Sequence, residues 1–313
     1  MDTYTLTTDE HDALQDGLLQ LLIEFDRVCR RLDIPYQLGA GSLLGAVRHQ
    51  GIIPWDDDAD VCMLREHYDR FLREAPRELQ SDFYLQHTGS EPAHPFFFAK
   101  LRLEATVLGC PFTERLGIHQ GIYLDIFPFD DVRPNRWPGR FHMALVSKIC
   151  RELTALAVHP EQHLAVSRSF SGQLLVRGLD RLMRMVGKNR LHAVTVWLAA
   201  CYSRFSKVGG DEQRWVTCLI SSPADPVLRQ KRVRTLGAFV RTSLMPFCGY
   251  SFPVPQNYDE VLTNLYGDYR QLPALEYRRP QHPITRFRFD RPRGQGLRAT
   301  SSGVGSLDGA SDP

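Results

Sequence analysis

The sequence of 313 residues lacks the cysteine spacing of a disulfide-stabilised or zinc-binding protein. Its seven cysteines are an odd number, and no two of them form a C-x-x-C pair. These absences argue against a disulfide framework and against a zinc knuckle. We therefore expect reduced cysteines that behave as small buried hydrophobic residues.

The sequence also lacks long apolar runs and a strong net charge. No stretch approaches the roughly 20 apolar residues of a membrane-spanning helix. The N-terminal stretch MDTYTLTTDEHD is acidic and has no apolar centre, unlike a signal peptide. A net charge of +2 gives no argument for nucleic acid as a partner. We expect a cytoplasmic protein, with the inner face of the membrane as the alternative location.

What is present is the composition of a globular protein with a sizeable core, 43% hydrophobic and 24% charged. Thr7 and Glu10 form the pattern of a capping box, and apolar residues at helical spacing continue to about Asp33. Further helices are expected over 136–158 and 173–206. Strands are expected at 36–38, 59–64, 83–86, 96–102, 105–108 and 122–127. This order predicts an α/β or α+β fold, a mixed sheet flanked by helices.

The middle of the chain is basic. From Arg133 to Arg190 there are eleven Lys and Arg against three Asp and Glu, so this segment carries +8 and the remainder about −6 (2 − 8). On the helix expected after Gln173, one apolar side is predicted to face the core and an arginine-rich side to face solvent. The segment 133–190 has two interpretations: a solvated charged face, which is the commoner case, or a surface for an anionic acceptor or a peripheral membrane contact.

A glycine-rich turn precedes the short helix expected to end near Gly51. Gly39, Gly41 and Ser42 fall at its start, where glycines allow close approach of a ligand and the helix N-terminus attracts an anion. A lone G-x-G-S is most often only a turn. As a hypothesis, these three residues bind phosphate.

Acidic residues crowd the stretch IPWDDDADVCM. If residues 59–64 form a strand, Asp58 and Asp60 project from the same face. Two such carboxylates suit a hard divalent cation, whereas an isolated D-x-D is more often a solvated loop. The apolar residues on both sides indicate partial burial, which favours a bound counter-charge.

A third acid, Asp125, lies inside the apolar strand pattern GIYLDIFPF. A charge in that position is unfavourable unless paired, so Asp125 is predicted to complete a carboxylate triad from a neighbouring strand. Asp130 and Asp131 follow Pro128 and are expected in a turn or cap. Lys100, Arg48 and His49 are candidate partners of phosphate oxygens, although such residues are more often surface cations.

Three blocks of the sequence resemble one known family. GSLLGAVRHQGIIPWDDDADVCM, HQGIYLDIFPFD and FPVPQNYDEVLTNLYGDYRQLP are similar to conserved blocks of the LicD phosphocholine-transferase family, which also contains fukutin and fukutin-related protein. Together they span residues 39–131 and 252–273. The first block is long and unusual in composition, so the resemblance is specific.

We expect four regions: a catalytic core over 1–132, a basic, mainly helical insertion over 133–212, a part completing the catalytic domain over 213–290, and a disordered tail over 291–313, which is rich in Gly, Ser and Pro. The resemblance implies a nucleotidyltransferase-like fold. It also implies Mg²⁺-dependent transfer, with Mn²⁺ as an alternative ion, of a phosphoalcohol from a CDP-linked donor to a hydroxyl of a glycan or lipid-linked acceptor. Asp58, Asp60 and Asp125 match its metal-binding acids.

Several functions remain open on the sequence alone. Asp125 is the candidate general base, and acidification of the acceptor hydroxyl by the metal ion is the alternative. The same three acids would serve a nucleotidyltransferase that releases pyrophosphate. A non-catalytic binding module on this fold is the third hypothesis. The block YGDY, residues 266–269, is expected either to pack in the core or to cover the donor site.

Overall fold

The computed structural model describes residues 4–166, 170–201, 214–220 and 225–291. A seven-stranded sheet forms the centre of the molecule, with the order β1-β2-β6-β4-β3 and with β7 and β8 extending it beside β6. Only β2 and β6 run parallel, and the other pairs are antiparallel. The strands are β1 (Gln37–Leu38), β2 (Ala59–Leu64), β3 (Phe83–Gln86), β4 (Ala99–Leu103), β6 (Tyr123–Val132), β7 (Trp215–Thr217) and β8 (Arg234–Thr235). The predicted α/β class with a mixed sheet is confirmed.

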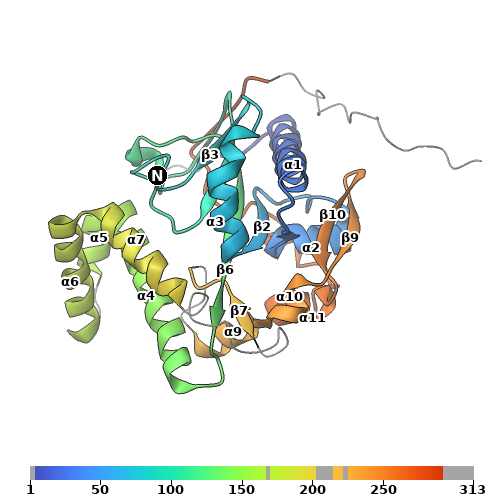
Figure 1. Cartoon of the computed structure of the whole chain (residues 1–313). Helices are drawn as coiled ribbons and strands as arrows, with labels where there is room; N and C mark the ends of the chain where they lie inside the picture. The colour runs from blue at the N-terminus through green and yellow to red at the C-terminus, as the bar shows by residue number, and fades with distance from the viewer. Residues whose placement is uncertain (1–3, 167–169, 202–213, 221–224, 292–313) are drawn as a thin grey trace, which may run out of the picture.

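Helices α1 (Thr8–Arg31) and α3 (Arg65–Glu74) cover one face of this sheet (Figure 1). Their side chains meet over it, since the rings of Phe25 and Phe71 lie 4.9 Å apart. Alternate strand residues such as Val61, Leu101 and Leu124 face the same core. The intervening residues therefore project from the opposite face.

The predicted capping box at the start of α1 is confirmed. The Thr7 hydroxyl accepts from the Glu10 backbone N–H, and the Glu10 carboxylate accepts from the Thr7 backbone N–H at 2.9 Å. Helix α2 (Ala40–His49) follows β1 directly and ends at Gln50 in the left-handed conformation.

Strand β6 is longer than predicted, so placing Asp130 and Asp131 in a turn was wrong. The strand pairs with β4 up to Ile126 and with β7 from Asp130 onward. Pro128 falls between the part of β6 that pairs with β4 and the part that pairs with β7. Its missing N–H therefore removes no hydrogen bond from either antiparallel pair. Both aspartates are buried, and each pairs with an arginine from another element.

Four helices form a separate group at the left of Figure 1: α4 (Trp137–Val158), α5 (Pro160–Ala165), α6 (Phe170–Val186) and α7 (Lys188–Ala199). They enclose a second core that includes Val146, Leu153 and Leu191. On α6, Val176 and Leu179 are buried, whereas Leu182 and Val186 are exposed. The predicted burial of the apolar stripe was therefore wrong at its C-terminal end.

The remaining elements return the chain to the central sheet. The segment contains α9 (Pro226–Lys231), α10 (Leu236–Val240), the hairpin of β9 (Thr242–Phe247) and β10 (Tyr250–Pro255), and α11 (Tyr258–Tyr266). Strand β11 (Arg286–Phe289) pairs with β5 (Thr106–Gly109). Residues of this return, among them Phe252, Leu262 and Ile284, belong to the same core as α1. The predicted tail lies outside the described residues except for Arg291.

Two sequence expectations concern individual side chains. All seven cysteines are free, as predicted, but Cys248 is exposed and Cys110 and Cys201 are only partly buried. Of the YGDY block, Tyr269 is buried and Tyr266 is exposed, so only Tyr269 is a core aromatic residue.

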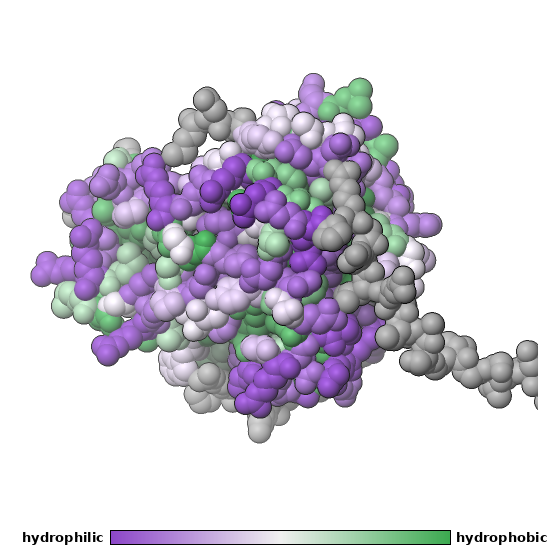
Figure 2. Space-filling view, turned by 90° about the horizontal axis from the view of Figure 1, so that it is seen from above, coloured by the Kyte–Doolittle hydropathy of each residue, from purple (hydrophilic) through white to green (hydrophobic). Residues whose placement is uncertain are grey.

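The described part of the chain contains no helix with the combined length and apolar character needed to cross a bilayer. Figure 2 shows one face of the molecule, which is mainly hydrophilic, with hydrophobic residues in separate areas between the hydrophilic ones.

Candidate active site

A row of three charged side chains crosses the open face of the sheet. Asp60 of β2 lies in register with Asp125 of β6, and Asp125 lies in register with Lys100 of β4. Residues directly opposite on adjacent strands project to the same side. The sheet therefore places two acids and one amine side by side, opposite the face covered by α1 and α3.

Asp58, the residue directly before β2, adds a third carboxylate beside this row. One carboxylate oxygen each from Asp58, Asp60 and Asp125 lie within 4.8 Å of one another. The strand alternation that points Asp60 to the open face gives Asp58 the same direction, two residues earlier. Three carboxylates thus converge from two neighbouring strands.

The convergence disfavours the charged state of the acids. Burial, partly opposed by His282 and reinforced by the charge of Asp125, raises the pKa of Asp58 to about 6. Burial, with repulsion from Asp58 and Asp125, raises the pKa of Asp60 well above its ordinary value. The site is therefore short of positive charge when all three acids are ionised.

Lys100 supplies one of the counter-charges. Its Nζ donates to Asp125 Oδ1 at 2.5 Å and lies 3.5 Å from the centre of the Tyr123 ring. Burial lowers the pKa of Lys100, and the charge of Asp125 opposes that effect. Held this way, the ammonium group is fixed beside the carboxylates.

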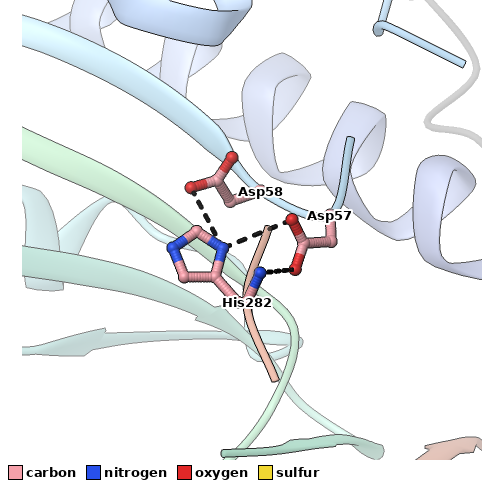
Figure 3. A group of neighbouring side chains, drawn as sticks. All are labelled: Asp57, Asp58 and His282. Atoms are coloured by element: carbon pink, nitrogen blue, oxygen red, sulfur yellow. Dashed lines mark hydrogen bonds and ion pairs between the residues drawn. The ribbon is translucent and has the colours of Figure 1, made fainter. Parts of the chain in front are cut away.

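The second cation is His282, from the chain return before β11. Its Nδ1 lies 3.3 Å from Asp57 Oδ1 and 3.7 Å from Asp58 Oδ2 (Figure 3). The hydrogen bond with Asp57, helped by the charge of Asp58, raises the pKa of His282 to about 9, so the ring is protonated at neutral pH. Sequence reasoning missed both Asp57 and His282.

Asp57 attaches the chain return to the site. Its carboxylate accepts from the backbone N–H groups of Gln281 at 3.1 Å and His282 at 3.0 Å. The acid lies within the DDD run, but His282 follows it by more than 200 residues, and nothing in its local sequence pointed to the site.

Comparison with known proteins supports the resemblance predicted above. Residues 33–143 match the family model described as LicD/FKTN/FKRP, nucleotidyltransferase domain. That range contains the triad and both strands that carry it. The resemblance to this family is therefore confirmed over residues 33–143.

The chain is also similar to individual LicD-type sequences. It is 28% identical over 267 residues to the lipopolysaccharide cholinephosphotransferase LicD of Haemophilus influenzae, which covers 84% of this chain and 92% of that protein. Shorter matches include uncharacterized proteins of Rickettsia typhi, 39% identical over 71 residues and 23% of each chain, and of Rickettsia prowazekii, 47% identical over 50 residues, or 16% of this chain and 19% of that protein. The similarity to the Haemophilus protein thus extends well beyond the LicD domain.

The glycine-rich turn of the LicD domain packs against the acidic strand. A Cβ on Gly39 would lie 2.6 Å from Cys62 Sγ, and one on Gly41 would lie 2.7 Å from Asp56 Oδ2. Ser42 Oγ accepts from the backbone N–H of Asp60 at 2.8 Å. These residues hold the turn against β2, and their predicted contact with phosphate stays a prediction.

Ala40 stands between those glycines with a φ of 35°, a left-handed conformation that is unfavourable for a residue with a Cβ. Such backbone strain concentrates at functional sites, where the surrounding structure enforces it. Ala40 is also the first residue of α2, whose N-terminal N–H groups have no side-chain cap.

Arg48 and His49 lie at the far end of α2, away from the turn. Arg48 donates to the carbonyls of Tyr269 at 3.1 Å and Gln271 at 3.3 Å. Neither residue lines a cavity that adjoins the carboxylates. The structure therefore does not bring them to the triad, unlike Lys100.

Two cavities adjoin the triad. One, of about 390 Å³, is lined by Asp60, Cys62 and the residues of β8. The other, of about 630 Å³, is lined by Asp125 and Lys100 and by aromatic residues such as Phe98. Substrates could thus reach the acids from two sides.

Proposed function

We propose that this protein transfers a phosphoalcohol, phosphocholine or a close analogue, from a CDP-linked donor to a hydroxyl of a glycan or lipid-linked acceptor. The observation that carries the proposal is the convergence of Asp58, Asp60 and Asp125 inside a LicD-type domain. The similarity to a lipopolysaccharide cholinephosphotransferase over most of both chains supports the type of reaction.

The three acids fit a divalent cation. They offer only oxygen ligands, and they outnumber the two cations beside them, Lys100 and His282. Hard ions such as Mg²⁺ or Mn²⁺ prefer carboxylate oxygens. Bound there, the ion would neutralise negative charge on the diphosphate.

The transfer itself involves bond exchange at phosphorus, removal of a proton and positioning of the acids. The acceptor oxygen forms a new P–O bond to the phosphorus of the phosphoalcohol. The P–O bond to the nucleotide breaks, and CMP leaves with the electron pair. Asp125 is our candidate for accepting the hydroxyl proton, and Lys100 would stabilise the charge beside it. Ser42 would keep Asp60 in place through the backbone of β2.

The experiment that tests the function identifies the leaving group. The purified chain is incubated with Mg²⁺ and a panel of CDP-alcohols and nucleoside triphosphates. We expect CMP from a CDP-alcohol. Asp60→Asn should reduce that rate on the order of 100-fold or more, whereas Asp12→Asn, at an exposed aspartate of α1, should not change it.

Other outcomes identify the rival functions. Release of pyrophosphate from a nucleoside triphosphate would indicate a nucleotidyltransferase. Nucleotide binding with no turnover would indicate a binding module. Near-native turnover by Asp60→Asn would remove the metal-binding role of the triad.

An acceptor at a membrane fits an exposed stripe on α4. Trp137, Phe141 and Leu145 recur every four residues and are exposed, Trp137 by 74% and Phe141 by 61%. Arg136 and Arg140 stand at the same end of the helix, as in helices that lie on anionic lipid. As part of the proposal, this stripe contacts the membrane peripherally.

Vesicle co-sedimentation at low salt tests the contact. The chain should bind vesicles with phosphatidylserine more strongly than neutral vesicles, and the double variant Trp137→Ala, Phe141→Ala should bind less. Tyr277→Ala, at an exposed aromatic residue of the chain return, is the matched control. Equal binding by both variants would contradict the proposed contact.

A further inference from the structure

The smaller cavity beside Asp60 is rich in positive charge. Three cationic residues of the segment around β8, Lys231, Arg232 and Arg234, line it. Asp60 lines the same cavity, and so does Ala40, at the uncapped N-terminus of α2. The cavity therefore connects the acidic triad with an electropositive wall, contributed by residues about 170 positions later in the chain.

Arg234 is the least exposed of these three cations, and it has no acidic partner among the described residues. Its guanidinium lies over the rings of Phe129, at 5.4 Å, and Phe239, at 5.9 Å. Glu260 also lines the cavity, but no carboxylate among the described residues lies within ion-pair distance of Arg234. Burial lowers the pKa of Arg234. The two rings compensate only part of the desolvation of the guanidinium.

Other arginines of the sheet region have acceptors for their guanidinium groups. Arg65 binds Asp130 through two hydrogen bonds, and Arg214 binds Asp131 in the same way. The buried Arg102 has no carboxylate partner but donates to two other oxygen acceptors. Arg234 is partly buried and has neither a carboxylate partner nor a hydrogen-bond acceptor among the described residues. Its planar fork of donors matches phosphate geometry, so an anionic group of a ligand would supply the missing charge.

The position of Arg234 also fits a diphosphate. Its charge acts on the thiol of Cys62, which lines the same cavity. Cys62 is two residues beyond Asp60 on the same face of β2, about 7 Å along the strand. A ligand held at the triad by one phosphate would extend its next anionic group toward the guanidinium.

We infer that Arg234 binds the diphosphate of a nucleoside diphosphate-linked donor, which enters through this cavity, and that the larger cavity beside Asp125 receives the acceptor. This inference rests on the proposed function, since it assigns the donor of that reaction to one side of the triad. Arg234 thereby determines specificity for the donor.

Calorimetric titration with CDP in the presence of Mg²⁺ tests the inference on the full chain. We expect Arg234→Gln to weaken CDP binding about 10- to 100-fold and Arg234→Lys to weaken it less, because lysine keeps the charge but not the planar fork. Arg241→Gln, at an exposed arginine that does not line the cavity, is the control and should bind like the wild type. In turnover, Arg234→Gln should raise the KM for the donor and leave the KM for the acceptor unchanged.

A stability measurement separates this role from a structural one. Arg234→Met removes a buried cation that lacks an acidic partner and keeps an apolar side chain against Phe129 and Phe239. Its thermal midpoint without ligand should therefore equal or exceed that of the wild type. A lowered midpoint, with unchanged CDP affinity for Arg234→Gln, would show that Arg234 only stabilises the fold.

The remaining outcomes are distinguishable. If the wild type binds CDP and Arg234→Gln binds it equally well, the inference fails and the proposed function stands. If Arg234→Gln raises only the KM for the acceptor, the assignment of the two cavities is overturned. If the wild type does not bind CDP, both the inference and the CDP-linked donor of the proposed function fail.

Discussion

Ser42 shows how a single residue of the glycine-rich turn shapes the site. Its hydroxyl is buried and accepts from the backbone N–H of Asp60. Asp60 lies directly opposite Asp125 on the neighbouring strand, so a shift of the Asp60 backbone would displace the triad. Ser42 is therefore a positioning residue in the proposed reaction.

Ser42→Ala should lower the free energy of unfolding by about 1–3 kcal/mol, because a buried N–H loses its acceptor. Turnover should fall with it, since Asp60 is no longer fixed. Urea denaturation and CMP release measure the two effects. The matched control is Ser147→Ala. The Ser147 hydroxyl is also buried but has no hydrogen-bond partner within the described part of the chain, so its loss should be neutral or stabilising.

Asp60 itself should show opposite effects on stability and on metal binding. Asp60→Asn removes a buried charge whose pKa is raised by burial and by its acidic neighbours, so in EDTA its thermal midpoint should equal or exceed that of the wild type. Added Mg²⁺ should raise the midpoint of the wild type and leave that of the variant unchanged. An equal shift in both proteins would place the ion elsewhere.

At the scale of elements, strand β6 connects the site to the rest of the fold. Its first half carries Asp125 on the open face, and its second half carries Asp130 on the face toward α3. Arg65, the first residue of α3, donates to both oxygens of Asp130, at 2.7 and 3.0 Å. This ion pair fixes α3 against the strand that holds the triad.

Asp130→Ala should therefore destabilise the protein by about 3–5 kcal/mol, because it leaves the buried Arg65 with only the partly exposed Asp69, 3.8 Å away, as an acidic partner. The double variant Arg65→Met, Asp130→Leu should recover much of that loss, since it buries no unpaired charge. Glu74→Ala breaks the exposed pair with Arg70 on the same helix and should change stability by about 1 kcal/mol or less. Chemical denaturation of the four proteins measures the differences.

At the scale of the whole molecule, the partly buried His192 joins the helical group to the segment that leads into β4. The His192 ring of α7 stacks on Phe97, with centres 4.2 Å apart, and its Nε2 donates to the Phe96 carbonyl. Burial lowers the pKa of His192 to about 4, and burial lowers the pKa of His94 to about 3. The contact of α7 with the segment before β4 thus favours a neutral His192 ring.

This requirement predicts a loss of stability in acid. Between pH 6.5 and about 4 the unfolded chain binds a proton at His192 that the native state does not bind, so acidification favours unfolding. The stability of the wild type relative to His192→Asn should fall by about 1.4 kcal/mol per pH unit in that window. Above the ordinary pKa of histidine the difference should be constant. A pH-independent difference would show that His192 is protonated as readily in the native state.

The sequence by itself determined what depends on local spacing. The two-residue period of a strand directs Asp58 and Asp60 to one face, and an acid inside an apolar strand needs a partner, which identified Asp125. The capping box at Thr7 and the α/β class follow from equally local patterns. The glycine-serine turn and the acidic strand also sufficed for the resemblance to the LicD family.

Only the tertiary structure decided which distant residues meet. His282 reaches the acids and Arg234 reaches the cavity beside Asp60 because the chain returns to the sheet after the helical group, and no local pattern specifies that path. Arg48 was predicted near phosphate, but one helix length separates it from the turn. Pairing across a sheet and closure of a cavity depend on contacts between segments that are far apart in the sequence. The free energy of these contacts cannot be inferred from a short stretch of sequence.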